Sequence, residues 1–135
     1  MPQHILIPVA LDHENVAPRK IAVARRLLDE GGRITLLTVL EDVPGFVAEF
    51  VDLKPVNHLS QRIREKLDAV ADGAPDIATD VITGKAGMSI ANYAKEHAVD
   101  LIVVGSHKPG AQDYFLGSTA ARVARRAPCS VYILR

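Results

Sequence analysis

Short apolar runs rich in Ile, Leu and Val alternate along this chain with stretches whose apolar residues recur at helical spacing. The runs are typical of buried strands, and they span residues 5–9, 33–39, 77–82, 100–104 and 130–134. Strands that alternate with helices need crossover connections, which favour a parallel sheet with helices on both faces. The 135 residues fit one domain. The sequence therefore predicts a single α/β domain, residues 1–135, built on a five-stranded parallel sheet.

The stretches between the runs predict amphipathic helices. In the first, an apolar face is expected from Ala17, Ile21, Ala24, Leu27 and Leu28. Its basic residues, which include Lys20, fall mostly off that face. Residues 41–55 carry two prolines and little period, so they predict a long excursion, with or without a short helix, before a helix over residues 56–70. A third helix holds Ile90, Tyr93 and Ala94, with His97 expected at the edge of the core, and a fourth spans residues 118–126.

Composition and charge argue against several classes of partner. Lys and Arg number 16, as do Asp and Glu, and aromatic residues are few, so neither phosphate backbones nor unpaired bases are expected ligands. No apolar run approaches the roughly 20 residues that cross a bilayer, and the N-terminus does not resemble a signal peptide. The single cysteine, Cys129, suits a reducing compartment and is expected to be a buried structural thiol, which favours a cytoplasmic protein. The five histidines lack metal-site spacing, so no metal site is expected.

The loops that follow the first and fourth strands are the expected ligand site. Open parallel sheets bind ligands outside the carboxyl ends of their strands, where the strand order reverses. Gly105 ends the fourth strand and allows close approach, and Gly117, Ser118 and Thr119 open a helix. Two explanations are open for Ser118: it caps the helix, or it belongs to a phosphate site that uses the free N–H groups of the helix N-terminus.

The segment from Leu101 to Gly110, together with residues 115–134, resembles the C-terminal signature of the universal stress protein family. Residues 5–9 and 36–41 resemble the first two strands of that family. The resemblance implies a five-stranded parallel sheet of order 3-2-1-4-5 and an ATP site, with or without magnesium. The Ser-His-Lys-Pro sequence at 106–109 resembles a subgroup with a His-Arg-Pro-type loop.

The resemblance also implies which residues hold the nucleotide. Pro8, Val9 and Val39 would border the adenine and the ribose. The ribose and phosphates would be approached by Val104 and Gly105, and held by Gly117, Ser118 and Thr119. Ala10 stands where nucleotide-binding members usually carry Asp. In the loop, His107 either donates to a phosphate or is merely exposed, and Lys108 either pairs with a phosphate or is solvated.

Three functions are open on this basis. The first is a stress-response protein that binds ATP or AMP, forms a homodimer through its last strand and hydrolyses ATP very slowly at most. The second is a dimeric interaction module without nucleotide affinity, which Ala10 and Lys108 favour. The third, an enzyme, has the least support, because neither loop supplies paired carboxylates or a nucleophile with a base.

Overall fold

The computed structural model describes residues 2–10, 17–40, 53–106 and 116–135 of the chain. Strands and helices alternate through these ranges, as the apolar runs predict. The elements are β1 (His4–Pro8), α1 (Ala17–Leu27), β2 (Arg33–Leu40), α3 (Leu53–Ala71), β3 (Ile77–Thr83), α4 (Ala86–Glu96), β4 (Leu101–Gly105), α5 (Ser118–Arg126) and β5 (Ser130–Leu134).

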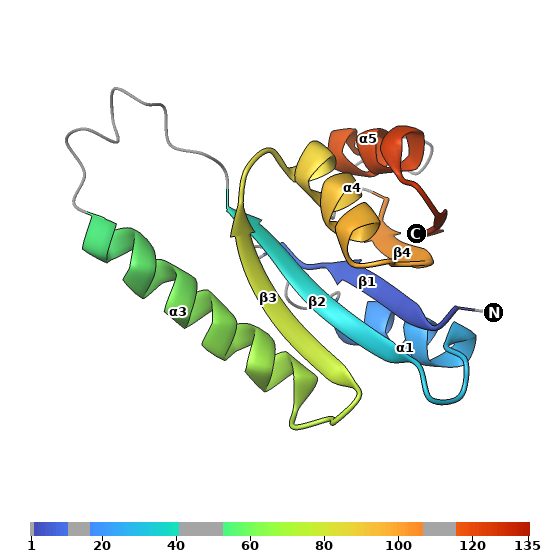
Figure 1. Cartoon of the computed structure of the whole chain (residues 1–135), viewed down its shortest axis with the longest axis horizontal. Coiled ribbons are helices and arrows are strands. Elements are labelled where there is room, and N and C mark those ends of the chain that lie inside the picture. Colours follow the sequence, from blue (N-terminus) through green and yellow to red (C-terminus); the bar gives the residue numbers. More distant parts are fainter. Residues whose placement is uncertain (1, 11–16, 41–52, 107–115) are drawn as a thin grey trace.

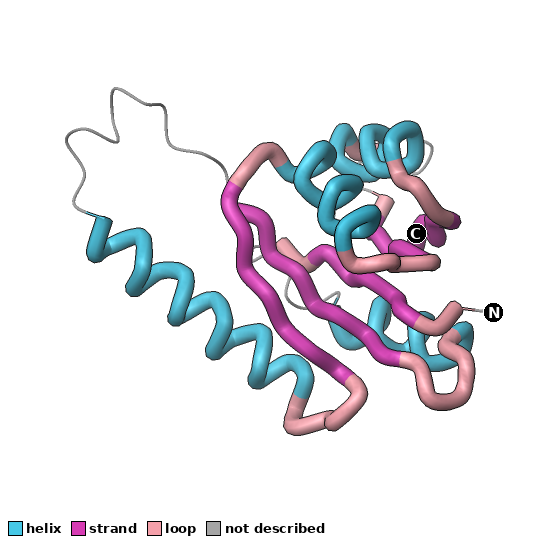
Figure 2. The backbone as a smooth tube through the Cα atoms, viewed as in Figure 1, coloured by secondary structure: helices cyan, strands magenta, loops and turns pink. Residues whose placement is uncertain are grey.

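The strands form one sheet in the order β3-β2-β1-β4-β5, and every neighbouring pair is parallel. Figure 2 shows them side by side between two layers of helices. The predicted α/β fold and its strand order 3-2-1-4-5 are confirmed. The order reverses between β1 and β4, which places the expected ligand edge at the carboxyl ends of these two strands.

Alternating side chains divide the core into two clusters, one on each face of the sheet. Ile5 and Ile7 of β1 are fully buried in a cluster with residues of α1 and α3, whereas Leu6 is buried in a cluster with α4 and α5. This division follows from the two-residue period of a strand that is covered on both sides. Figure 1 shows α4 and α5 together on one side of the sheet and α1 and α3 away from them.

The two central strands separate toward their carboxyl ends. β1 stays paired with β2 along its whole length, and β4 with β5. β1 and β4 are in register at two positions, Ile5 with Leu101 and Leu6 with Ile102. Beyond them, residues 7–8 of β1 and 103–105 of β4 are not in register with each other. We call this region, in which residues 7–8 and 103–105 are not paired in register, the β1–β4 split.

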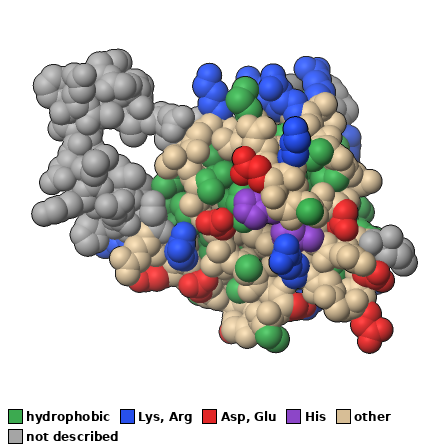
Figure 3. Space-filling model, viewed as in Figure 1, with side chains coloured by type: hydrophobic (Ala, Val, Ile, Leu, Met, Phe, Trp, Pro, Cys, Tyr) green, Lys and Arg blue, Asp and Glu red, His purple; other side chains and the backbone are tan. Residues whose placement is uncertain are grey.

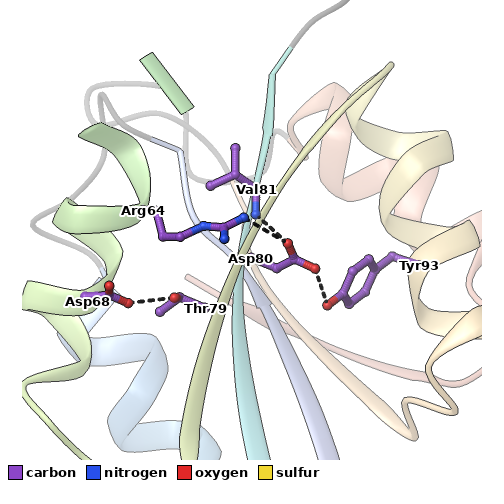
Figure 4. A network of polar contacts seen from close by, with 6 residues as sticks. All are labelled: Arg64, Asp68, Thr79, Asp80, Val81 and Tyr93. Carbon is purple, nitrogen blue, oxygen red and sulfur yellow. Dashed lines mark hydrogen bonds and ion pairs between the residues drawn. The ribbon is translucent and has the colours of Figure 1, made fainter. Parts of the chain in front are cut away.

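A network of polar contacts covers the outer edge of β3 (Figure 4). The Asp80 carboxylate accepts hydrogen bonds from the Tyr93 hydroxyl on α4 and from the Val81 N–H, each at 2.9 Å. An Arg64 guanidinium nitrogen on α3 lies 3.7 Å from the same carboxylate. Thr79 also donates to Asp68 of α3 at 2.6 Å. The edge strand is thereby tied to a helix on each face.

Three side-chain expectations are wrong. Lys20, expected off the apolar face of its helix, is buried, whereas Leu27, expected on that face, is 37% exposed. His97 lies at the C-cap of α4 and is exposed rather than at the edge of the core. α3 also begins at Leu53, inside the segment expected as an excursion. Pro55 is tolerated there because a first-turn N–H has no intrahelical acceptor to lose.

None of the helices in the described ranges is long and apolar enough to span a membrane.

Candidate functional site

The described residues of the predicted site lie at or just beyond the carboxyl ends of β1, β2 and β4 and at the start of α5. They are Pro8, Val9, Ala10, Val39, Val104, Gly105, Gly117, Ser118 and Thr119. His107 and Lys108 lie outside the described residues, so their expected roles stay predictions. The sheet thus gathers at one edge residues that are more than 100 positions apart in the sequence.

The end of β1 is held against β2 and not against β4. The Val9 N–H donates to the Leu37 carbonyl at 2.8 Å, and the Thr38 hydroxyl donates to the Val9 carbonyl at 2.9 Å. Val9 is buried, whereas Ala10, the next residue, is exposed. Both bonds hold the end of β1 on the β2 side, and residues 7–8 of β1 have no partners in register on β4.

The end of β4 is held in the same way against β5. Beyond Gly105, the Ser106 N–H donates to the Leu134 carbonyl at 3.0 Å. The Ser106 carbonyl in turn accepts a hydrogen bond from the Gly117 N–H at 2.5 Å. This second bond joins the carboxyl end of β4 to the residue that precedes α5. The helix therefore begins directly beside the strand end, although ten residues separate Ser106 from Gly117 in the sequence.

Among the described residues, no side chain caps the N-terminus of α5. Gly117 is the N-cap residue, and the first intrahelical bond runs from the Ala121 N–H to the Gly117 carbonyl at 2.9 Å. Ser118 and Thr119 are exposed residues of the first turn. Of the two explanations open for Ser118, the first, that it caps the helix, is therefore wrong. First-turn N–H groups have no intrahelical acceptors, and together with the helix dipole they attract anions.

The position of α5 is fixed by a close approach to α4. A Cβ atom on Gly87 would lie 2.6 Å from the Arg122 Cβ, which is closer than real Cβ contacts come. The absent side chain thus lets the two helix backbones pack tightly. Because Arg122 belongs to α5, the same contact holds the α5 N-terminus against the sheet edge.

Lys20 is the site residue that the sequence analysis missed. It projects from α1 to the end of β1, where its ammonium donates to the Pro8 carbonyl at 3.1 Å. The side chain is 7% exposed, and burial lowers the pKa of its ammonium. Its spacing from the buried Ala17 and Ala24 was the available signal, because positions 17, 20 and 24 share one face of a helix.

Apolar side chains line both faces of the sheet behind this edge. Val39 and Val104 belong to the core cluster under α4 and α5, and Val9 belongs to the cluster under α1 and α3. Val104 is 4% exposed and Val39 is partly buried. The edge therefore combines an apolar base with N–H groups, hydroxyls and one ammonium, which suits an organic anion.

A second polar cluster lies at the opposite, amino-terminal edge and is internally satisfied. The buried His4 ring contacts the Thr35 hydroxyl at 2.8 Å through Nε2 and the His97 carbonyl at 3.1 Å through Nδ1. Asp100 accepts from the N–H groups of Gln3 and His4. Burial, the largest of several influences, lowers the pKa of His4. These contacts join β1 to the α4–β4 turn and are structural.

The remaining candidate groups are the thiol of Cys129, metal-ligating side chains and the arginines of α5, and none of them forms a second site among the described residues. Cys129 is a free, half-buried thiol, and burial raises its pKa, which disfavours the nucleophilic thiolate. No group of three or more His, Cys, Asp or Glu side chains among the described residues is arranged to hold a metal ion. Arg122, Arg125 and Arg126 of α5 are exposed, and Figure 3 shows Lys and Arg side chains gathered at the top of this view, near α5.

Comparison with known proteins gives consistent matches over the whole chain. Residues 1–135 match the universal stress protein family. The universal stress protein UspA from Lactobacillus plantarum is 29% identical, with a TM-score of 0.69 over 98% of this chain and 97% of that one.

Two further solved structures share the fold. One is a universal stress protein in complex with cAMP, 21% identical, with a TM-score of 0.62 over 99% of this chain and 97% of that one. The other is the universal stress protein from Archaeoglobus fulgidus in complex with dAMP, 15% identical, with a TM-score of 0.65 over 98% of both chains.

Proposed function

The chain belongs to the universal stress protein family, and we propose that it binds an adenine nucleotide, ATP or AMP, at the carboxyl ends of β1 and β4. The uncapped start of α5 is the observation that carries this proposal. Its first-turn N–H groups lie next to the end of β4, and neither Gly117 nor Ser118 supplies a side-chain acceptor for them. A phosphate group would satisfy these donors and would meet the positive end of the helix dipole.

The choice of adenine rests on the two solved relatives, whose cAMP and dAMP share that base. The Ser-His-Lys-Pro sequence at 106–109 adds a resemblance to the subgroup with a His-Arg-Pro-type loop, whose members can bind ATP, and we propose that ligand here, with or without magnesium. Val39, which is partly buried, offers apolar surface for the base and ribose on the sheet face that α5 covers, and the buried Val104 packs in the same cluster. The residues implied for each part of the nucleotide are therefore compatible with one ligand lying along this edge.

Replacing Ser118 with Asp is expected to change the stability of α5 and the affinity for phosphate in opposite directions. A carboxylate in the first turn of α5 favours the helix by about 0.3–1 kcal/mol because it faces the positive end of the dipole. The same carboxylate repels a bound phosphate. We therefore expect Ser118→Asp to raise the melting temperature and weaken ATP binding in calorimetry. Ser118→Ala is the uncharged control and should lose less affinity.

Two results would contradict the proposal. The first is a wild-type protein that neither retains a nucleotide on purification nor binds ATP or AMP at millimolar concentration. That result would favour the alternative, a dimeric interaction module without nucleotide affinity, with Ala10 as the first residue to examine. The second is a Ser118→Asp variant that binds ATP as tightly as the wild type, which would place the phosphates elsewhere.

We also propose a homodimer joined through β5. This strand is the last in the sheet order and alternates exposed and partly buried residues, and its Tyr132 is 39% exposed. Edge strands present unpaired backbone groups that favour pairing with another copy. Light scattering should show a dimer for the wild type and a monomer for Tyr132→Lys, with Tyr132→Phe as the matched control. A monomeric wild type at all concentrations would exclude this interface.

We further propose a role in the stress response, in the cytoplasm, by binding and not by turnover. The free Cys129 suits a reducing compartment. The described residues at the ligand edge contribute N–H groups, hydroxyls and an ammonium, but no carboxylate or imidazole that could serve as a base. ATP hydrolysis is therefore expected to stay well below the ordinary enzyme range of about 1–1000 per second. A measured turnover within that range would refute this reading.

A further inference from the structure

We propose that Lys20 is a specificity residue, which gives the site its preference for phosphorylated ligands by placing an ammonium group at the β1–β4 split. The inference rests on the proposed nucleotide function and adds a contact from α1, an element that the family resemblance did not assign to the site. The ligand chemistry it names is the phosphate of an adenine nucleotide, as opposed to the base or the ribose.

The position of the ammonium is set by both central strands. Its hydrogen bond goes to the Pro8 carbonyl, at 3.1 Å, in the part of β1 that is not in register with β4. From the other side, a Cβ on Gly105 would lie 3.5 Å from the Lys20 Cε and 3.8 Å from its Nζ. The charge is therefore located between the separated strand ends, next to the glycine that permits close approach of a ligand.

The charge has no counterion among the described residues. The ion pairs formed there do not include Lys20, although its side chain is only 7% exposed. A single carbonyl satisfies one of the three N–H donors of an ammonium. Burying a charge without a partner of opposite sign is unfavourable, and burial accordingly lowers the pKa of this group. An anionic ligand would supply a partner of opposite sign.

A purely structural role would not require a charged side chain at position 20. Holding the Pro8 carbonyl needs a single donor, and filling the space beside Ala17 and Ala24 needs only an aliphatic chain. An apolar residue on this face of α1 would match its buried neighbours. A lysine here retains a charge that no described side chain pairs with, and it lies at the carboxyl edge of the sheet, where open parallel sheets bind ligands.

Calorimetry with adenosine, AMP and ATP tests the inference on the full-length protein. Lys20→Met keeps the length of the side chain and removes the charge, and Lys20→Arg keeps the charge. Lys95→Met, at an exposed position of α4, is the matched control. We expect Lys20→Met to reduce the affinity for AMP and ATP by roughly 10- to 150-fold, the strength of a charge-assisted hydrogen bond. Its affinity for adenosine should be unchanged, and Lys20→Arg should retain part of the preference.

A second measurement on the wild type does not depend on any variant folding. The NMR signal of the Lys20 ε-carbon should move on addition of AMP and stay in place with adenosine. An equal loss of affinity for adenosine and AMP in Lys20→Met, or no loss at all, overturns the inference and leaves nucleotide binding intact. A wild type that binds no adenine nucleotide overturns both, so the two failures are distinguishable.

Discussion

Removing one oxygen atom, in Tyr93→Phe, measures what the network on β3 contributes to stability. The Tyr93 hydroxyl donates to the Asp80 carboxylate at 2.9 Å and ties α4 to the edge strand. A hydrogen bond to a charged group contributes about 1.5–3 kcal/mol net. The Asp80 side chain is 34% exposed, so water replaces part of the lost bond and the lower value applies. With an unfolding entropy of about 2.1 cal/mol/K per residue over this chain, about 1.5 kcal/mol corresponds to a fall of about 5 °C in melting temperature.

Urea and thermal unfolding of Tyr93→Phe, wild type and Tyr132→Phe give the comparison. Tyr132 is 39% exposed, and no hydrogen bond of its hydroxyl is found among the described residues, so its variant should stay within about 0.5 kcal/mol of wild type. The denaturant dependence should be the same in all three proteins, because no apolar surface changes. Equal stabilities for the two variants would refute the reasoning, since the Asp80 contact would then contribute nothing beyond the ring itself.

Three further outcomes are expected. Burial, followed by the Asp80 carboxylate, raises the pKa of Tyr93 to about 12 from 10.0, so ultraviolet titration should detect the late ionisation of Tyr93 by comparison with Tyr93→Phe. The stability from this neutral phenol is complete below pH 10.0 and is lost between that pH and about 12. Burial lowers the pKa of His4 below 6.5, so its stabilising contribution is present above pH 6.5 and is lost on acidification, and unfolding of His4→Gln should show a flatter acid limb. Gly87→Val should cost about 1–3 kcal/mol by forcing α4 from α5, a loss that thermal unfolding would detect.

The strands of this fold were predictable because apolar residues fill them, and the three central strands, β1, β2 and β4, are buried on both faces. A continuous apolar run of this kind is visible in the sequence without knowledge of its neighbours. All five strands were found, and their ends moved by no more than one residue, as with β1 at His4–Pro8 instead of residues 5–9. The site edge followed from the strand order, because the order alone decides where two neighbouring crossovers diverge.

The details of the site were not predictable, for three physical reasons. Lys20 was expected mostly off the apolar face of its helix because its side chain is charged, although its spacing from Ala17 and Ala24 favours that face. The aliphatic part of a lysine side chain can pack on an apolar face while its ammonium reaches a polar group, here the Pro8 carbonyl. Capping was one of two explanations open for Ser118, but the boundary of α5 depends on backbone angles, which make Gly117, one residue earlier, the N-cap. The β1–β4 split depends on how long two non-consecutive strands stay in register, and no pattern within either strand records that.

The polar contacts on the outer edge of β3 limit how many copies can add to the sheet. The Val81 N–H is satisfied by the neighbouring Asp80 carboxylate, so at that position β3 offers no free donor to an incoming strand. β5, at the other end of the sheet, has no such acidic residue in its sequence, Ser-Val-Tyr-Ile-Leu. In the proposed dimer the two β5 strands face inward, and each outer border is a β3 strand. Growth along the sheet then ends at two copies, because a fibre would need both borders of every copy to accept a neighbour.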